Sequence, residues 1–145
     1  MSYAGDVTCE DCWEALGAKR DSQLLDVRSA AEWAFVGYPA LETLDKNLLL
    51  VEWQQFPHMQ INPNFVEQTS TRLQTAGADA GSDIFTPCRS GARSISAAQA
   101  LTAAGFKNVY NVLCGFEGAS DGHGHRGTIS GWKFDGLPWV QNRRQ

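Results

Sequence analysis

The chain has 145 residues, a net charge of −4 and 43% hydrophobic residues. This length and composition predict one globular domain, residues 1–145, with a sizeable core. The acidic balance and scattered basic residues argue against nucleic-acid and membrane partners, and no apolar run approaches the roughly 20 residues of a membrane span. The N-terminus lacks a secretory-signal pattern, so we expect a cytoplasmic protein in which the four cysteines of the chain are reduced thiols.

Helix and strand patterns alternate along the chain. Polar capping residues followed by apolar periodicity indicate helix starts, and short apolar runs bounded by polar residues indicate buried strands. In chain order, the sequence predicts a helix at 8–18, a strand at 23–28, a short helix from 29, a strand at 47–53, a helix at 62–77, a strand at 82–87, a helix at 90–105 and a strand at 108–113.

Buried strands that alternate with helices indicate a parallel sheet with helices on both faces. Ligand sites in such sheets lie beyond the carboxyl ends of the strands. Three loops therefore point to the same edge of the sheet. We expect them to bring together Asp26 and Arg28 from the first loop, Cys88 from the second, and Cys114 with Gly115 from the third.

The segment CRSGARS, residues 88–94, is the strongest candidate for chemistry. Cys88 follows a predicted strand and precedes a predicted helix, whose N-terminal end carries the positive end of its dipole. Gly91 permits a tight turn whose N–H groups form an anion nest, and Arg89 and Arg93 add full charges. All these features favour the thiolate, which is the nucleophilic form of cysteine. The alternative is a buried structural cysteine between two surface arginines.

These segments together resemble the single-domain rhodanese-like sulfurtransferases. LLDVRSAAEWAFVG is similar to that family's D-V-R and E-[WYF] segment, CRSGARS to its active-site loop, and GWKFDGLPW to its C-terminal W and G-L-P motif. The resemblance covers nearly the whole chain. It implies an α/β domain with a central parallel sheet of about five strands, the first of them short and near residues 6–7.

The resemblance also implies a mechanism. Cys88 would take the outer sulfur from a small anionic donor, thiosulfate or a persulfide, and pass it to a thiol or to cyanide, without a metal or an organic cofactor. Asp26 and Arg28 would brace the loop, although a surface pair between Arg28 and Glu32 is an alternative. The implied substrate-binding residues are Arg89, Ser90, Gly91, Ala92, Arg93 and Ser94.

Some positions depart from the family's pattern. Residues 37–39, Gly-Tyr-Pro, stand where the family commonly has G-H-I, and Cys114 stands where it often has a glycine. If the strands before Cys88 and Cys114 are adjacent, the Cys114 thiol lies within reach of a Cys88 persulfide and can resolve it as a disulfide. The alternative is that Cys114 fills a small space in the turn.

Several alternatives stay open on the sequence. A cysteine-dependent phosphatase or arsenate reductase also uses a Cys and Arg loop, but its loop has five residues between them and this chain has four. A non-enzymatic persulfide carrier or interaction module is a third possibility. Cys9 and Cys12 form a C-x-x-C, more often a pair of half-buried small residues than a zinc or redox site. His123 and His125 are more often loop residues than metal ligands.

Overall fold

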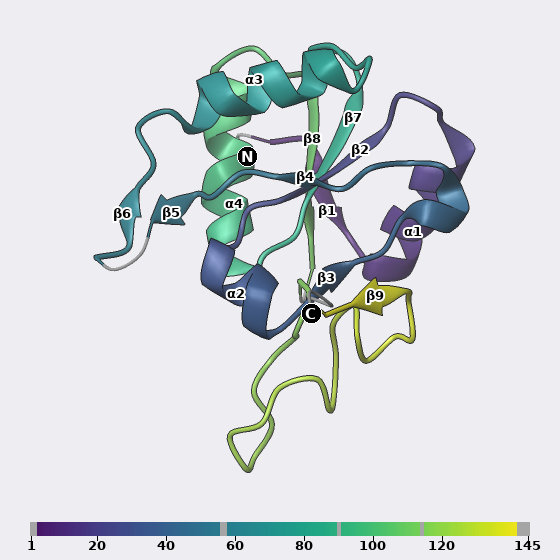
Figure 1. The fold of residues 1–145 in the computed structure, drawn as a ribbon, viewed down its shortest axis with the longest axis vertical. Helices are drawn as coiled ribbons and strands as arrows, with labels where there is room; N and C mark the ends of the chain where they lie inside the picture. The colour runs from purple at the N-terminus through teal and green to yellow at the C-terminus, as the bar shows by residue number, and fades with distance from the viewer. Residues whose placement is uncertain (1–2, 56–57, 90, 114, 142–145) are drawn as a thin grey trace.

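The computed structural model of the chain describes residues 3–55, 58–89, 91–113 and 115–141 (Figure 1). Its central sheet has five parallel strands in the order β1-β8-β7-β2-β4. These strands are β1 (Gly5–Val7), β2 (Gln23–Asp26), β4 (Leu49–Leu50), β7 (Asp83–Thr86) and β8 (Asn108–Val112). The helices are α1 (Cys9–Ala18), α2 (Ala30–Phe35), α3 (Phe65–Thr75), α4 (Ala92–Ala103) and the short 3-10 helix η1 (Glu42–Leu44).

Neighbouring residues on the central strands enter two separate cores. Leu24 and Phe85 pack in a cluster with side chains of α1, whereas Leu25 and Ile84 pack in a cluster with side chains of α3 and α4. Successive side chains on a strand point to opposite faces, so a strand buried on both faces is apolar throughout. Figure 1 shows α1 on one side of the sheet and α4 on the other. The predicted parallel sheet with helices on both faces is confirmed.

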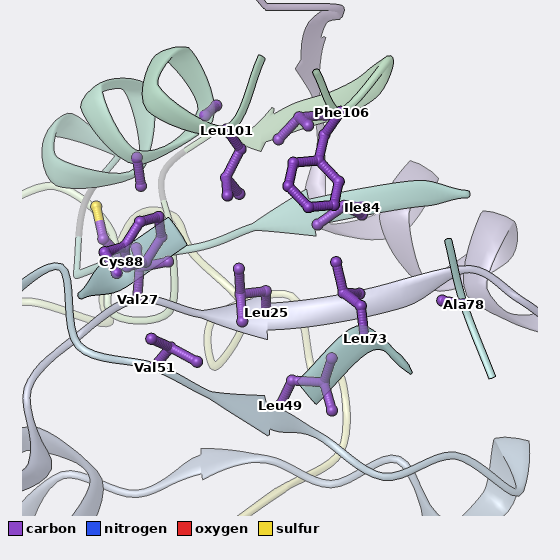
Figure 2. Close-up of a cluster of buried hydrophobic side chains, with 14 residues drawn as sticks. Leu25, Val27, Leu49, Val51, Leu73, Ala78, Ile84, Cys88, Leu101 and Phe106 are labelled. Carbon is purple, nitrogen blue, oxygen red and sulfur yellow. The ribbon is translucent and has the colours of Figure 1, made fainter. Parts of the chain in front are cut away.

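The cluster beneath α3 and α4 ends at the candidate site. It extends along the sheet from Phe106 at one end to Cys88 at the other (Figure 2). Val27 and Val51 lie beside Cys88 in this cluster, and both are almost fully buried. The backbone of the cysteine loop is therefore anchored in the hydrophobic core.

Side-chain caps account for the starts of the first two helices. The Thr8 hydroxyl accepts the Asp11 N–H at 3.0 Å, directly before α1. The Ser29 side chain and the Glu32 carboxylate each accept a backbone N–H of the other residue, which forms a reciprocal capping box for α2. The predicted starts of both helices are confirmed.

The other two helices begin later than predicted. The Asn62 side-chain oxygen accepts the Asn64 N–H at 3.0 Å and closes a turn, so α3 begins only at Phe65. Gly91 has a φ of 109°, in the left-handed region, so α4 begins only at Ala92. None of the helices in the described ranges is long and apolar enough to cross a membrane.

Two small antiparallel pairings were not anticipated from the sequence. The strand predicted at 47–53 is regular only at β4, and the chain then forms a hairpin of β5 (Gln54–Gln55) and β6 (Gln60–Ile61). Trp53 turns into the core and meets the Phe65 ring edge-on, with 5.1 Å between ring centroids. The second pairing joins β3 (Tyr38–Pro39) to β9 (Trp139–Val140). Strands of two residues carry too little periodicity to be recognised.

Candidate active site

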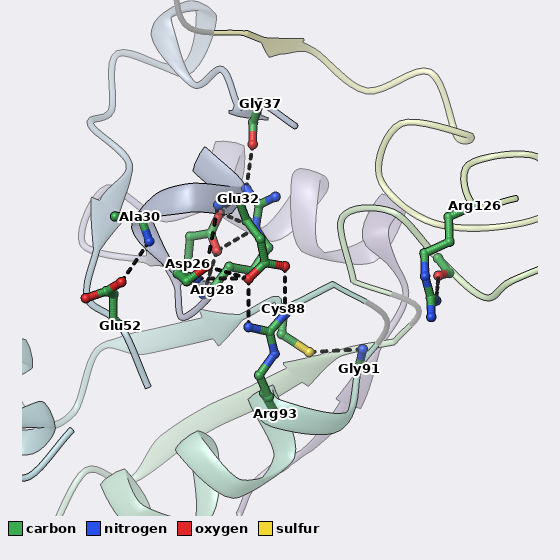
Figure 3. A network of polar contacts seen from close by, with 12 residues as sticks. Asp26, Arg28, Ala30, Glu32, Gly37, Glu52, Cys88, Gly91, Arg93 and Arg126 are labelled. Atoms are coloured by element: carbon green, nitrogen blue, oxygen red, sulfur yellow. Dashed lines mark hydrogen bonds and ion pairs between the residues drawn. The ribbon is translucent and has the colours of Figure 1, made fainter. Parts of the chain in front are cut away.

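Cys88 lies two residues after β7, in the loop that leads to α4. Its side chain is 1% exposed, and its Sγ accepts the Gly91 N–H at 3.1 Å (Figure 3). Glycine adopts the left-handed conformation at position 91 without steric cost, and in it the N–H faces the sulfur. An N–H donor of this kind stabilises negative charge on the sulfur. Ser90, predicted to contribute to this nest, lies outside the described residues.

Backbone hydrogen bonds hold the cysteine loop against the turn that follows β8. The Phe116 N–H donates to the Cys88 carbonyl at 2.7 Å, and the Gly118 N–H donates to the Arg89 carbonyl at 3.0 Å. Gly115 has a φ of 56°, and a Cβ there would lie 2.3 Å from the Cys88 oxygen. This close approach requires glycine at position 115.

The three loops predicted to meet do so in the described residues. The Val27 N–H donates to the Pro87 carbonyl at 3.2 Å, which joins the first loop to the second, and the turn after β8 joins from the other side. Cys114, the predicted resolving thiol, lies outside the described residues.

Asp26 and Arg28 form a fully buried ion pair beneath the loop. The Arg28 Nη2 donates to Asp26 Oδ2 at 2.6 Å and to the Gly37 carbonyl at 2.8 Å. The Arg28 guanidinium also lies over the Phe116 ring, 4.3 Å from its centroid. Because the Phe116 N–H holds the Cys88 carbonyl, the ion pair supports the loop through Phe116. The alternative of a surface pair between Arg28 and Glu32 is wrong.

Arg93, in the first turn of α4, pairs instead with Glu32 of α2. Its Nη1 and Nη2 donate to the two carboxylate oxygens of Glu32, each at 2.7 Å (Figure 3). Burial alone would raise the pKa of Glu32, but the hydrogen bonds from Arg93 and Ser29 outweigh it and lower the pKa to about 2. The hydrogen bond to Glu32 raises the pKa of Arg93 in turn. Glu32 is therefore a carboxylate at neutral pH.

From the sequence, Glu32 belonged to the family-like E-[WYF] segment and to a possible surface pair with Arg28, and its pairing with Arg93 in the site was missed. One signal was present in the sequence. Glu32 follows the loop after β2, which was predicted to face the same edge of the sheet as Cys88. A charged residue in the first turn of that helix is therefore close to the site.

Ser94, a predicted substrate-binding residue, directs its side chain into the domain. Its hydroxyl is hydrogen-bonded to the side-chain oxygen of Asn111 on β8, and Asn111 Nδ2 donates to Asp6 of β1 at 3.0 Å. Both Ser94 and Asn111 are buried. The Ser94 side chain thus fixes the start of α4 to the sheet.

A cavity of about 420 Å³ lies in front of Cys88. The β5–β6 hairpin supplies one wall, and the Gln54 side chain braces that wall by donating to the Met59 carbonyl at 3.0 Å. The hairpin's part in the site was not predicted. A larger hollow of about 500 Å³ is lined by other residues, among them Trp33, Glu52 and Gln55, and by no cysteine. The cavity in front of Cys88 is lined by Glu32, Gln54, Met59, Cys88, Arg89, Ala92 and Arg93.

The other two described cysteines lie in the core. Cys9 and Cys12 lie on the buried face of α1, in the cluster that holds Leu24 and Phe85, and the Cys9 thiol donates to the Gly115 carbonyl at 3.4 Å. Burial raises the pKa of Cys12 well above its ordinary value. This environment agrees with the interpretation of both as small core residues. No group of three or more His, Cys, Asp or Glu side chains within the described ranges is placed to hold a metal ion.

Comparison with solved structures defines the class of the protein. The fold is rhodanese-like. The polysulfide-sulfur transferase homodimer of Wolinella succinogenes aligns with a TM-score of 0.57 at 19% identity, over 99% of this chain and 82% of that chain. A rhodanese-like domain protein of Staphylococcus aureus aligns with a TM-score of 0.52 at 21% identity, over 77% and 86%.

More similar proteins and a family model define the family. Rv0390 from M. tuberculosis is 43% identical, and its crystal structure aligns with a TM-score of 0.88 over 97% of this chain and all of that chain. An uncharacterized Rickettsia rickettsii protein, the RP600 homolog, is 34% identical over 127 residues, 88% of this chain and 89% of its own. Residues 4–145 match the model described as the STR4 middle domain, and the chain belongs to that family.

One relative with a named activity matches a shorter segment. Thiosulfate sulfurtransferase 18 of Arabidopsis thaliana is 46% identical over 55 residues, which are 38% of this chain and 37% of that protein.

Proposed function

We propose that the protein is a sulfurtransferase that carries sulfane sulfur on Cys88. The observation that carries this proposal is the position of the Cys88 Sγ, which faces a cavity lined by two arginines and accepts the Gly91 N–H. The similarities to a thiosulfate sulfurtransferase and to a polysulfide-sulfur transferase support it. Such a reaction needs a reduced thiol, which the cytoplasm maintains.

The chemistry is two displacements at one sulfur atom. The Cys88 thiolate attacks the outer sulfur of the donor, the donor's S–S bond breaks, and the electron pair leaves on sulfite or on a thiolate. An acceptor thiolate or cyanide then attacks the outer sulfur of the Cys88 persulfide and releases the Cys88 thiolate. The N–H of Gly91 lies where it can stabilise the negative sulfur in each step. The steps balance without a metal or an organic cofactor.

A phosphatase or arsenate reductase is the less favoured alternative. Four residues separate Cys88 from Arg93, so the loop is one residue shorter than that of the phosphatase relatives. A phosphoryl group is held well by the fork of a free guanidinium at the end of the loop, whereas both terminal nitrogens of Arg93 at that position donate to Glu32. Both observations favour a smaller group, such as a single sulfur atom, at this site.

The test is to load the protein with sulfur. After treatment with thiosulfate or cysteine persulfide and removal of the donor, peptide mass spectrometry should find one added sulfur on the Cys88 peptide. Cys88→Ser should lose this species, because a hydroxyl does not form a persulfide. Cys9→Ser should keep it, because a serine hydroxyl can still donate to the Gly115 carbonyl. Absence of sulfur on Cys88 with both donors would reject the proposed function.

A further inference from the structure

The charges around the cavity nearly cancel. Its ionic side chains are Arg89, Arg93 and Glu32, whose charges sum to +1, and the Cys88 thiolate that the proposed reaction requires brings the sum to zero. The nearby pair of Asp26 and Arg28 is buried and neutral as a unit. Arg89 is exposed and makes no ion pair in the part of the chain that the structure describes.

Glu32 is held in place by groups that a donor cannot easily displace. Its Oε1 accepts the Ser29 N–H at 3.0 Å, the Ser29 hydroxyl at 2.9 Å and the Arg93 Nη1 at 2.7 Å. Its Oε2 accepts the Arg93 Nη2 at 2.7 Å. The capping box of α2 thus fixes a carboxylate against the guanidinium of Arg93. A donor anion that binds Arg93 must compete with this fixed carboxylate.

The charge of the donor decides how much this competition costs. Thiosulfate carries two negative charges, and it must approach a thiolate in a site whose own charges sum to zero. A deprotonated persulfide such as cysteine persulfide carries a single net negative charge. Because Coulomb energy scales with the product of the charges, a site whose charges cancel gives the dianion no advantage, whereas a site with one net positive charge attracts the dianion twice as strongly as the monoanion. Removal of the Glu32 charge would create that positive charge and so favour thiosulfate.

We propose that Glu32 determines the donor class of this site, by cancelling the charge of Arg93 so that singly charged persulfides are favoured over thiosulfate. This proposal rests on the proposed sulfurtransferase function. It makes Glu32 a specificity-determining residue, and it leaves Arg89 as the cation that attracts the donor.

The test compares two donors in two proteins. Wild-type kcat/KM should be higher for cysteine persulfide than for thiosulfate, whose second charge gains nothing in a site without net charge. Glu32→Gln, which keeps the shape and the cap acceptor, should raise kcat/KM for thiosulfate about ten-fold and that for the persulfide less than about three-fold. Glu52→Gln is the matched control. Glu52 accepts the N–H of Ala30, the first residue of α2, at 2.8 Å, but it lines the larger hollow and not the cavity of Cys88. Loss of the Glu52 charge should therefore leave the ratio of the two donors' kcat/KM unchanged.

The salt dependence of the wild-type enzyme provides a second measurement that needs no variant. A site with no net charge should give a thiosulfate kcat/KM that is nearly independent of ionic strength, whereas a cationic site gives a steep fall. A steep fall, or a donor ratio that Glu32→Gln leaves unchanged, would overturn the inference while sulfur loading of Cys88 still stood. Wild-type protein that takes sulfur from neither donor would overturn the proposed function and this inference together.

Discussion

Two helices of this protein begin beside a cysteine, and the two sulfur atoms have opposite surroundings. At the start of α1, the Cys9 thiol faces the carbonyl oxygen of Gly115, whereas before α4 the Cys88 sulfur faces the N–H of Gly91. Exposure does not separate them, since Cys9 is 3% exposed and Cys88 is 1% exposed. A carbonyl favours the protonated thiol and an N–H favours the thiolate, so backbone polarity distinguishes the two sites.

Access is the second difference between the two regions. Cys88 lines a cavity with two arginines, whereas Cys12 packs among apolar side chains, where burial raises its pKa. A C-x-x-C at the start of a helix is therefore not evidence of reactivity. The hydrogen-bond donors, the charges and the open space around the sulfur determine its reactivity.

Among the changes considered, Gly115→Ala should have the largest effect on stability and on Cys88, because Gly115 contacts both cysteine regions. Its carbonyl accepts the Cys9 thiol, and a Cβ would lie 2.3 Å from the Cys88 oxygen in a left-handed conformation. We expect a loss of about 2 to 4 kcal/mol in the free energy of unfolding, measured in urea, and slower sulfur loading of Cys88. Gly136→Ala also needs a positive φ, 77° against 56° at Gly115, but has nothing within 4 Å of the added Cβ, so it should cost about 1 kcal/mol. Equal losses in the two variants would show that the close approach is unimportant.

Acid should lower the free energy of unfolding by a smaller amount, through the ion pair of Glu32 and Arg93 beside Cys88. Because the folded pKa of Glu32, about 2, is below its ordinary 4.5, its ion pair stabilises the fold fully above pH 4.5, and this stability is lost as the pH falls towards 2. The pair is partly exposed, so after solvent screening the contribution is about 1 to 2 kcal/mol. The difference in unfolding free energy between wild type and Glu32→Gln should shrink by this amount between pH 5 and 2. Parallel pH profiles would show that the pair contributes no stability.

Local signals predicted much of the fold and part of the site. Some features depend only on residues close together in the chain, and these could be predicted from the sequence. They are the helix caps at Thr8 and Ser29, the apolar strands and Gly91 in the cysteine loop. The pairing of Glu32 with Arg93 was not predicted, because it joins two helices and depends on how both pack on the sheet. The hairpin wall at Gln54 was missed for a similar reason, since strands of two residues have no recognisable period.

The most direct test of the account is the relative reactivity of the thiols in the native protein. Iodoacetamide at pH 7, quenched at intervals and followed by peptide mapping, measures the alkylation rate of each cysteine, because the thiolate is the form that reacts. We expect Cys88 to react at least about 100-fold faster than Cys9 and Cys12. Alkylation of Cys9 or Cys12 at the same rate as Cys88, in protein that remains folded, would contradict this expectation.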